Sequence, residues 1–171
     1  QKRANDTVSL GLFLSMIHGI LLTVGCIGVL RPFLHLFTTN PEVIQNGITY
    51  GTLAFMFNFP NSIAIAYEKI YQAEGKMTVS MIAMLCGCIC NIILDPMMIF
   101  GIGFFPEMGI AGAALATGIG QVLTLVIYLI IYYTKESQLR IHFSKEMFQK
   151  TIYKRIYSVG LPATMNLSLP S

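Results

Sequence analysis

Long apolar runs separated by short polar connections dominate this chain. Four segments have this character, at residues 8–36, 43–68, 78–101 and 109–133. About 20 apolar residues in a helix cross a ~30 Å hydrocarbon layer at ~1.5 Å per residue. The pattern therefore predicts an all-α fold, a polytopic membrane bundle with four transmembrane helices in residues 1–134. No alternation of apolar and polar positions is sustained enough to indicate a β-strand.

The connections carry turn and capping signals. Asn40 precedes Pro41, which disfavours helix at Asn40 and suits the first position of a following helix. Gly75 has the position of a helix terminator, and residues 101–110 form a tight connection with three glycines. Connections this short make successive helices antiparallel neighbours.

The last part of the chain has a different pattern. In residues 135–158, Phe148, Ile152 and Ile156 recur every four positions among basic and polar residues. This spacing predicts an amphipathic connecting segment that lies on the cytoplasmic face of the membrane. Residues 159–171 have the pattern of the start of a further transmembrane helix, so we expect the chain to be a fragment of a longer protein.

Composition and charge agree with a membrane location. Of the 171 residues, 54% are hydrophobic and 11% are charged, whereas soluble domains carry roughly 25% charged residues. Of the eleven basic residues, Arg31 alone falls on one side of the predicted bundle, and the other ten fall on the side that carries both chain ends. The positive-inside rule therefore places both ends in the cytoplasm. No nucleic-acid partner is expected, because acidic residues interrupt the basic tail. The basic residues on the cytoplasmic side are Lys2, Arg3, Lys69, Lys76, Lys135, Arg140, Lys145, Lys150, Lys154 and Arg155.

The cysteines do not form a metal-binding pattern. Cys86, Cys88 and Cys90 alternate within the third segment, and alternate positions of a helix point about 200° apart. They cannot converge on one ion, and Cys26 lies in another segment. We interpret all four as packing residues.

The strongest candidate for chemistry is a carboxylate in the third apolar segment. Asn91 and Asp95 lie four positions apart, on one face of a helix. An ionised Asp at the centre of a lipid-exposed helix costs ~2.5–3.5 kcal/mol, so such residues usually face a bundle interior or a wet cavity. Pro96 removes the amide that would bond to the carbonyl of Ile92, which predicts a helix bend at Pro96. This oxygen-rich group suits Na⁺ or a proton. Alternatively, Asp95 bonds a neighbouring helix near the outer boundary.

Other polar residues inside the apolar segments have two interpretations each. Asn58 and Asn61 line a substrate cavity, or they satisfy the backbone freed by Pro60. Thr117 and Gln121 share a face of the fourth segment, where the Thr117 hydroxyl binds a ligand or its own helix. No nucleophile with a base and no phosphate loop is present, so neither enzymatic activity nor a cofactor is expected.

Several motifs together resemble one transporter family. They are "QAEGK" at 72–76, "NIILDPMMIFGIG" at 91–103, "MGIAGAALATGIGQ" at 108–121 and "VGLPA" at 159–163. They resemble the multidrug and toxic compound extrusion (MATE) family of cation-coupled efflux transporters. The resemblance implies that the chain holds helices three to six of twelve, plus the start of helix seven, in the amino-terminal lobe. Helices one, two and seven to twelve would then complete the protein.

The resemblance also implies a function and a site. It implies Na⁺- or H⁺-coupled antiport that exports drugs or other organic, often cationic, compounds across the cytoplasmic (inner) membrane. Asn91, Asp95 and Thr117 match three positions of the family's cation site, whose fourth member is an Asp on the first helix. One rival function is a lipid-linked polysaccharide precursor flippase, which would need more Lys and Arg in its spans than these apolar cores contain. Another rival is a structural membrane subunit, which would tolerate a neutral residue at Asp95.

Overall fold

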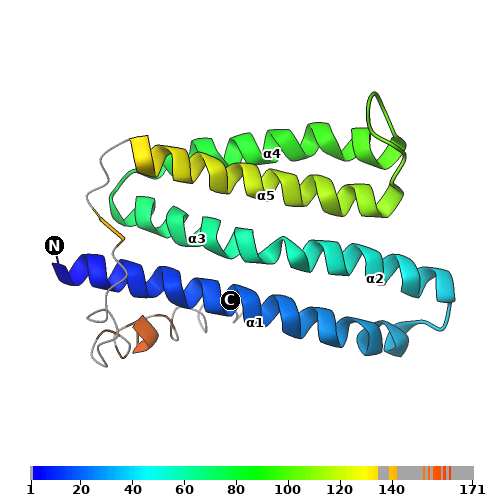
Figure 1. The fold of residues 1–171 in the computed structure, drawn as a ribbon, viewed down its shortest axis with the longest axis horizontal. Helices are drawn as coiled ribbons and strands as arrows, with labels where there is room; N and C mark the ends of the chain where they lie inside the picture. Colours follow the sequence, from blue (N-terminus) through cyan, green and yellow to red (C-terminus); the bar gives the residue numbers. More distant parts are fainter. Residues whose placement is uncertain are drawn as a thin grey trace.

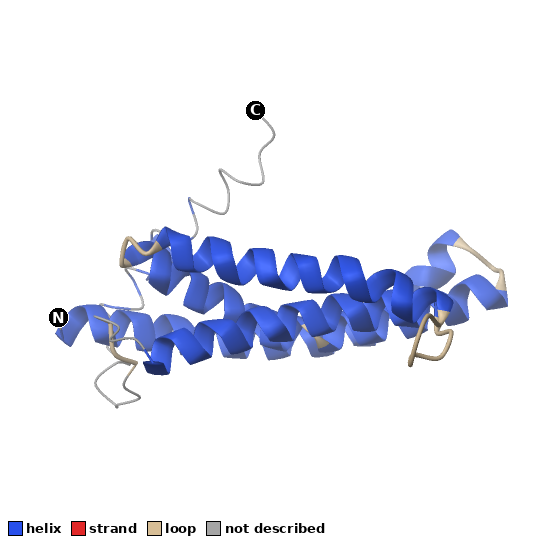
Figure 2. Ribbon diagram, turned by 90° about the horizontal axis from the view of Figure 1, so that it is seen from above, coloured by secondary structure: helices blue, strands red, loops and turns tan. Residues whose placement is uncertain are grey.

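Five helices form most of the part of the chain that the computed structural model describes, namely residues 2–134, 139–141, 152, 154, 156–158, 160 and 162. They run close to one common axis, and both views show an elongated bundle without strands among the described residues (Figures 1 and 2). The all-α fold class is confirmed. The helices are α1 (Lys2–Phe37), α2 (Pro41–Met56), α3 (Asn58–Ala73), α4 (Met77–Phe100) and α5 (Gly109–Thr134).

The two ends of the bundle differ in charge. One end carries the start of α1, the α3–α4 connection and the end of α5, and we call it the basic end (Figure 1). Lys69 and Lys76 belong to this end. The other end carries the α1–α2 and α4–α5 connections, and we call it the far end. Arg31 lies in the part of α1 that approaches the far end.

Length and hydropathy make this a multi-pass membrane protein. Within the described residues, three helical stretches are long and apolar enough to cross a membrane, at Ala4–Phe37, Met77–Phe100 and Gly109–Thr134. Their mean hydropathies are 2.1, 2.2 and 2.1. Large apolar side chains face outward along them, such as Leu21, which is 63% exposed, and Val24, which is 66% exposed. Apolar surface on this scale requires lipid or further protein against it.

The second apolar segment differs from its sequence prediction. One helix was predicted over 43–68, but the structure has α2 and α3 joined end to end at Phe57 (Figure 1). The physical reason is Pro60 in the first turn of α3. It has no amide to donate to the Met56 carbonyl, so the regular hydrogen bonding is interrupted at Met56–Phe57. The backbone stays in the right-handed helical region at Phe57, with φ −77° and ψ −9°, so the two helices continue in nearly the same direction.

A side chain from α1 supports this break. The Thr23 hydroxyl donates a hydrogen bond of 3.0 Å to the Phe55 carbonyl. We expect Thr23→Val to lower the stability of the complete protein by about 1 kcal/mol, since a partly buried carbonyl then loses a donor. Thermal unfolding in detergent measures this, with Thr49→Val as the matched control. Thr49 also carries a hydroxyl on α2, but this hydroxyl donates to the Gln45 carbonyl of its own helix, at 3.0 Å. Equal melting shifts in the two variants would contradict the bridging role of Thr23.

The connections follow the turn chemistry of the sequence. The Asn40 side chain caps α2 by accepting from the Glu42 amide at 3.0 Å, and Pro41 is the first residue of the helix. Gly75 follows α3 with φ +74°, a conformation that favours glycine. Gly101 caps α4 in the left-handed region at φ +68°. All three signals are therefore confirmed.

Tyrosines form much of the core near the basic end. Tyr71 and Tyr128 are each 1% exposed and stack with ring centroids 5.7 Å apart. The Tyr71 hydroxyl donates to the Tyr128 carbonyl at 3.1 Å, which joins α3 to α5. Ser80 brings in α4, because its carbonyl accepts from the Tyr128 hydroxyl at 3.4 Å. These bonds join α3, α4 and α5 to one another.

The segment after α5 is described only in part. The Tyr132 hydroxyl accepts from the Ile141 amide at 2.8 Å and donates to the Leu139 carbonyl at 3.3 Å. This places residues 139–141 against the end of α5. The predicted amphipathic segment at 135–158 and the predicted helix start at 159–171 otherwise lie almost wholly outside the described residues.

Candidate functional site

Close approach of α4 and α5 builds the site. Gly87 on α4 and Gly120 on α5 face each other so closely that a Cβ on Gly120 would lie 2.8 Å from the Gly87 carbonyl oxygen. Two helices can approach this closely only where side chains are absent. The glycine pair therefore brings the polar residues of the next helical turns within hydrogen-bonding distance of one another.

Three predicted site residues meet at this crossing. The Asn91 amide nitrogen donates to Asp95 Oδ1 at 3.3 Å along α4, and to Thr117 Oγ1 at 3.3 Å across to α5. Thr117 itself donates to the Ala113 carbonyl at 3.0 Å. Its hydroxyl hydrogen is thus used within its own helix, while its oxygen faces Asn91. The structure brings Asn91, Asp95 and Thr117 together as one hydrogen-bonded group.

The geometry of this group specifies what cation binding would require. Asn91 now directs its NH₂ toward the Asp95 carboxylate and the Thr117 oxygen. A cation beside Asp95 would need the Asn91 amide turned over, so that its carbonyl oxygen faced the ion instead. α4 runs without interruption through Pro96. The Ile92 carbonyl lacks its usual amide donor there, which adds a further hard oxygen on the same helix.

A cavity of about 310 Å³ opens beside the group, and we call it the chamber. Asn61 and Gln121, two of the predicted substrate-cavity residues, lie in its wall together with Asn91 and Thr117. Asn58 does not line the chamber, and neither does Asp95. The wall is formed by Asn61, Ala64, Ile65, Glu68, Met84, Gly87, Cys88, Asn91, Thr117, Gly120, Gln121, Thr124 and Tyr128.

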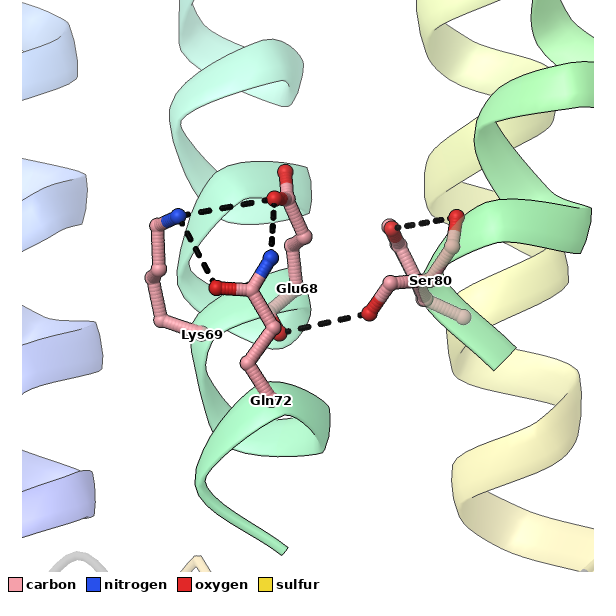
Figure 3. Close-up of polar contacts among 5 residues, drawn as sticks. Glu68, Lys69, Gln72 and Ser80 are labelled. Carbon is pink, nitrogen blue, oxygen red and sulfur yellow. Dashed lines mark hydrogen bonds and ion pairs between the residues drawn. The ribbon is translucent and has the colours of Figure 1, made fainter. Parts of the chain in front are cut away.

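Sequence reasoning missed one charged residue of the chamber. Glu68 lies in α3 and contributes to the wall, with a side chain that is 17% exposed. The Gln72 amide donates to Glu68 Oε1 at 2.6 Å, and Lys69 Nζ lies 3.5 Å from the same oxygen (Figure 3). The Ser80 hydroxyl of α4 donates to the Glu68 carbonyl at 3.5 Å (Figure 3). The available signal was the position of Glu68, the last residue of the predicted second helix.

The cysteines remain separate thiols. Cys26, Cys86, Cys88 and Cys90 are free, and only Cys88 lines the chamber. Within the described residues, no cluster of three or more His, Cys, Asp or Glu side chains could hold a metal ion. Among the described residues, Asp95 would offer an ion one carboxylate, beside carbonyl, amide and hydroxyl oxygens.

Comparison with known proteins now decides the family. A family model described as MatE matches residues 1–97, more than half of the chain. The chain belongs to the MatE family. It is 25% identical over 161 residues to the "Multidrug export protein MepA" of Staphylococcus haemolyticus, an alignment that covers 94% of this chain and 35% of that protein. The family resemblance of the sequence motifs is thus confirmed.

Solved structures give the same result for the fold. One is described as the outward-facing conformation of a multidrug resistance MATE family transporter of the MOP superfamily, with a TM-score of 0.83, 26% identity and coverage of 94% of this chain and 35% of that one. The inward-facing conformation under the same description gives a TM-score of 0.80, 26% identity and coverage of 92% and 35%. This MatE chain therefore spans about a third of the length of these relatives.

Proposed function

We propose that this MatE chain is part of the amino-terminal lobe of a cation-coupled exporter of drugs or other organic compounds. The observation that carries the proposal is the Asn91–Asp95–Thr117 group, a carboxylate with two neutral oxygen-bearing partners in an apolar bundle. A carboxylate inside a membrane bundle is typical of ion and proton pathways. The multidrug export protein to which the chain is similar supports organic compounds as the substrates.

The proposed mechanism is alternating access of the complete protein. Na⁺ or H⁺ binds at Asp95, and the organic substrate binds where the lobe faces its partner lobe. Coupling requires only that the cation and the substrate stabilise different states. Nearly equal TM-scores to structures described as outward-facing and inward-facing, 0.83 and 0.80, support a lobe that moves largely as a unit.

The proposed orientation places the basic end in the cytoplasm. Lys69 and Lys76 lie at that end, and the positive-inside rule assigns the excess of Lys and Arg to the cytoplasmic side. Asp95 is then nearer the outer surface than Asn91, while Glu68 lies toward the cytoplasm. The proposed location is the cytoplasmic membrane.

The flippase alternative is less well supported. A lipid pyrophosphate calls for Arg or Lys side chains, which bind phosphate oxygens directly. The residues that line the chamber include neither Lys nor Arg. The charged group in the chamber wall is the carboxylate of Glu68, which repels phosphate and attracts a cation.

The test separates the two coupling ions. The complete protein is reconstituted into liposomes, and ethidium transport is followed under an imposed Na⁺ gradient or an imposed pH gradient. We expect one of the two gradients to accelerate ethidium transport in the direction opposite to the ion. An ionophore that collapses this gradient should stop the ethidium transport. Transport that proceeds at one rate with either gradient and with none would overturn the proposal of cation coupling.

A further inference from the structure

The turn of α5 that carries Thr117 is held from two sides. On one side it meets α4, where the Thr117 hydroxyl oxygen accepts from the Asn91 amide at 3.3 Å. Gly120 belongs to the same side, because a Cβ on it would lie 2.8 Å from the Gly87 carbonyl oxygen of α4. Gly118 lies two positions before Gly120, which places it about 200° around the helix axis. Gly118 therefore faces away from α4, and whatever packs on it backs the turn from behind.

The ring of Phe57 packs on Gly118. A Cβ on Gly118 would overlap the Cγ, Cδ2 and Cε2 atoms of this ring, so only glycine leaves room for it. Gly118 is buried, and both α2 and α3 contact α5. The ring thus lies directly against the backbone of α5, with no flexible side chain between them. A change of side chain at position 57 therefore acts on the backbone next to Thr117.

The backbone of Phe57 is fixed at the joint between α2 and α3. Its amide donates to the Leu53 carbonyl at 3.3 Å, and its carbonyl accepts from the Asn61 amide at 3.1 Å. Two positions earlier, the Thr23 hydroxyl of α1 donates to the Phe55 carbonyl at 3.0 Å. Hydrogen bonds from α1, α2 and α3 therefore hold the backbone from which the ring projects.

The contact between Asn91 and Thr117 depends on the position of this turn. Hydrogen bonds from N–H to oxygen are typically about 2.7–3.2 Å long, so a contact of 3.3 Å tolerates little further separation of α4 and α5. The Thr117 oxygen is also one of the oxygens that a cation beside Asp95 would use. A small movement of the turn away from α4 would withdraw this oxygen from the site.

We propose that Phe57 is a positioning residue for the cation site, because its ring on Gly118 holds the turn of α5 that presents Thr117 to Asn91. The inference rests on the proposed cation-coupled function, and it names a residue outside the site that sets the affinity for the coupling ion. A smaller side chain at position 57 leaves space into which the turn relaxes away from α4. Ion binding is then weakened, whereas ethidium binding is unchanged.

The first test measures the ion dependence of ethidium transport by the complete protein in liposomes, with Phe57→Leu as the variant. We expect the ion concentration at the half-maximal rate to rise about 5-fold, the effect of one weakened hydrogen bond. The ethidium concentration at the half-maximal rate should stay unchanged. Phe57→Met, which has a longer side chain than leucine, is measured in parallel and should show a smaller rise. A lower maximal rate with a wild-type half-saturating ion concentration would show a purely structural role and overturn the proposal.

Phe59→Leu is the matched control. Phe59 is partly buried like Phe57 and lies two positions further along the chain, but its ring lies 3.5 Å from the place of a Cβ on Gly19 of α1. This ring therefore packs toward α1. The control should keep the wild-type half-saturating ion concentration. An equal rise in Phe57→Leu and Phe59→Leu would overturn the specific role of Phe57.

The second test needs no ion, because it measures thermal unfolding of the complete protein in detergent. Thr117→Val removes the oxygen that accepts from Asn91, and it should lower the melting temperature of the wild type. In Phe57→Leu protein this contact is already loosened, so the same change should cost roughly half as much or less. Equal losses in the two backgrounds would overturn the proposal. If neither Na⁺ nor H⁺ drives transport by the wild type, the proposed coupling fails, while this comparison still decides whether Phe57 positions Thr117.

Discussion

Asp95→Asn is expected to abolish gradient-driven efflux by the complete protein. The substitution keeps the shape of the side chain and a possible hydrogen bond to Asn91, but it removes the negative charge that would hold the coupling cation. Asp95 is partly buried, and opposite unit charges about 5 Å apart at an effective dielectric constant of about 20 attract each other by about 3 kcal/mol. Losing this attraction is roughly a 100-fold loss of cation affinity. Ethidium efflux from reconstituted liposomes, driven by whichever gradient is active, measures the effect.

The matched control is Glu107→Gln. Glu107 is an exposed carboxylate in the α4–α5 connection, close in sequence to Asp95 but outside the bundle, so its neutralisation should leave efflux unchanged. The melting temperature of Asp95→Asn should stay near that of the wild type, because the residue is replaced by its isostere. A wild-type rate in the Asp95→Asn protein would remove Asp95 from the transport mechanism and would favour a structural role for this membrane protein.

The helical framework follows from sequence because hydropathy and capping are local properties. The run from Met77 to Phe100 and the run from Gly109 to Thr134 are apolar along their whole length, and both form helices within a residue of the predicted bounds. The break at Phe57 was missed although Pro60 signalled it. A proline acts on a carbonyl four positions earlier, and here the gap is supported by Thr23, which lies on another helix.

The site was predictable only in part. The pairing of Asn91 with Asp95 follows from a spacing of four on one helix, whereas Thr117 lies 26 positions away and was assigned through family resemblance. The direction in which Asn91 turns its amide depends on where Thr117 sits, and no local pattern contains that information. Glu68 was overlooked for a related reason. It joins the chamber only because α3, α4 and α5 pack around a common space.

Gly112→Ala is expected to destabilise the complete protein strongly. A Cβ on Gly112 of α5 would lie 2.6 Å from the carbonyl carbon of Met98 and 3.1 Å from the Ile99 amide nitrogen on α4. These are backbone atoms, which cannot rotate away as a side chain can. The Met98 carbonyl also accepts a hydrogen bond of 3.0 Å from the Met108 amide, so displacing it would break a contact of the α4–α5 connection. Overpacking typically costs about 1–3 kcal/mol, and a clash with backbone atoms places this variant toward the upper end of that range.

Gly112→Ala should also disturb the contact between Asn91 and Thr117. Gly112 lies little more than one helical turn from Thr117, so forcing α4 and α5 apart there lengthens the 3.3 Å contact between Asn91 and Thr117. Gly25→Ala is the matched control. Apart from its own helix, a Cβ on Gly25 of α1 meets no atom of the described residues within 4 Å, and alanine favours helix, so the melting temperature of this variant should be unchanged or slightly raised. Equal melting temperatures for the two variants would mean that the close approach of α4 and α5 does not hold this site together.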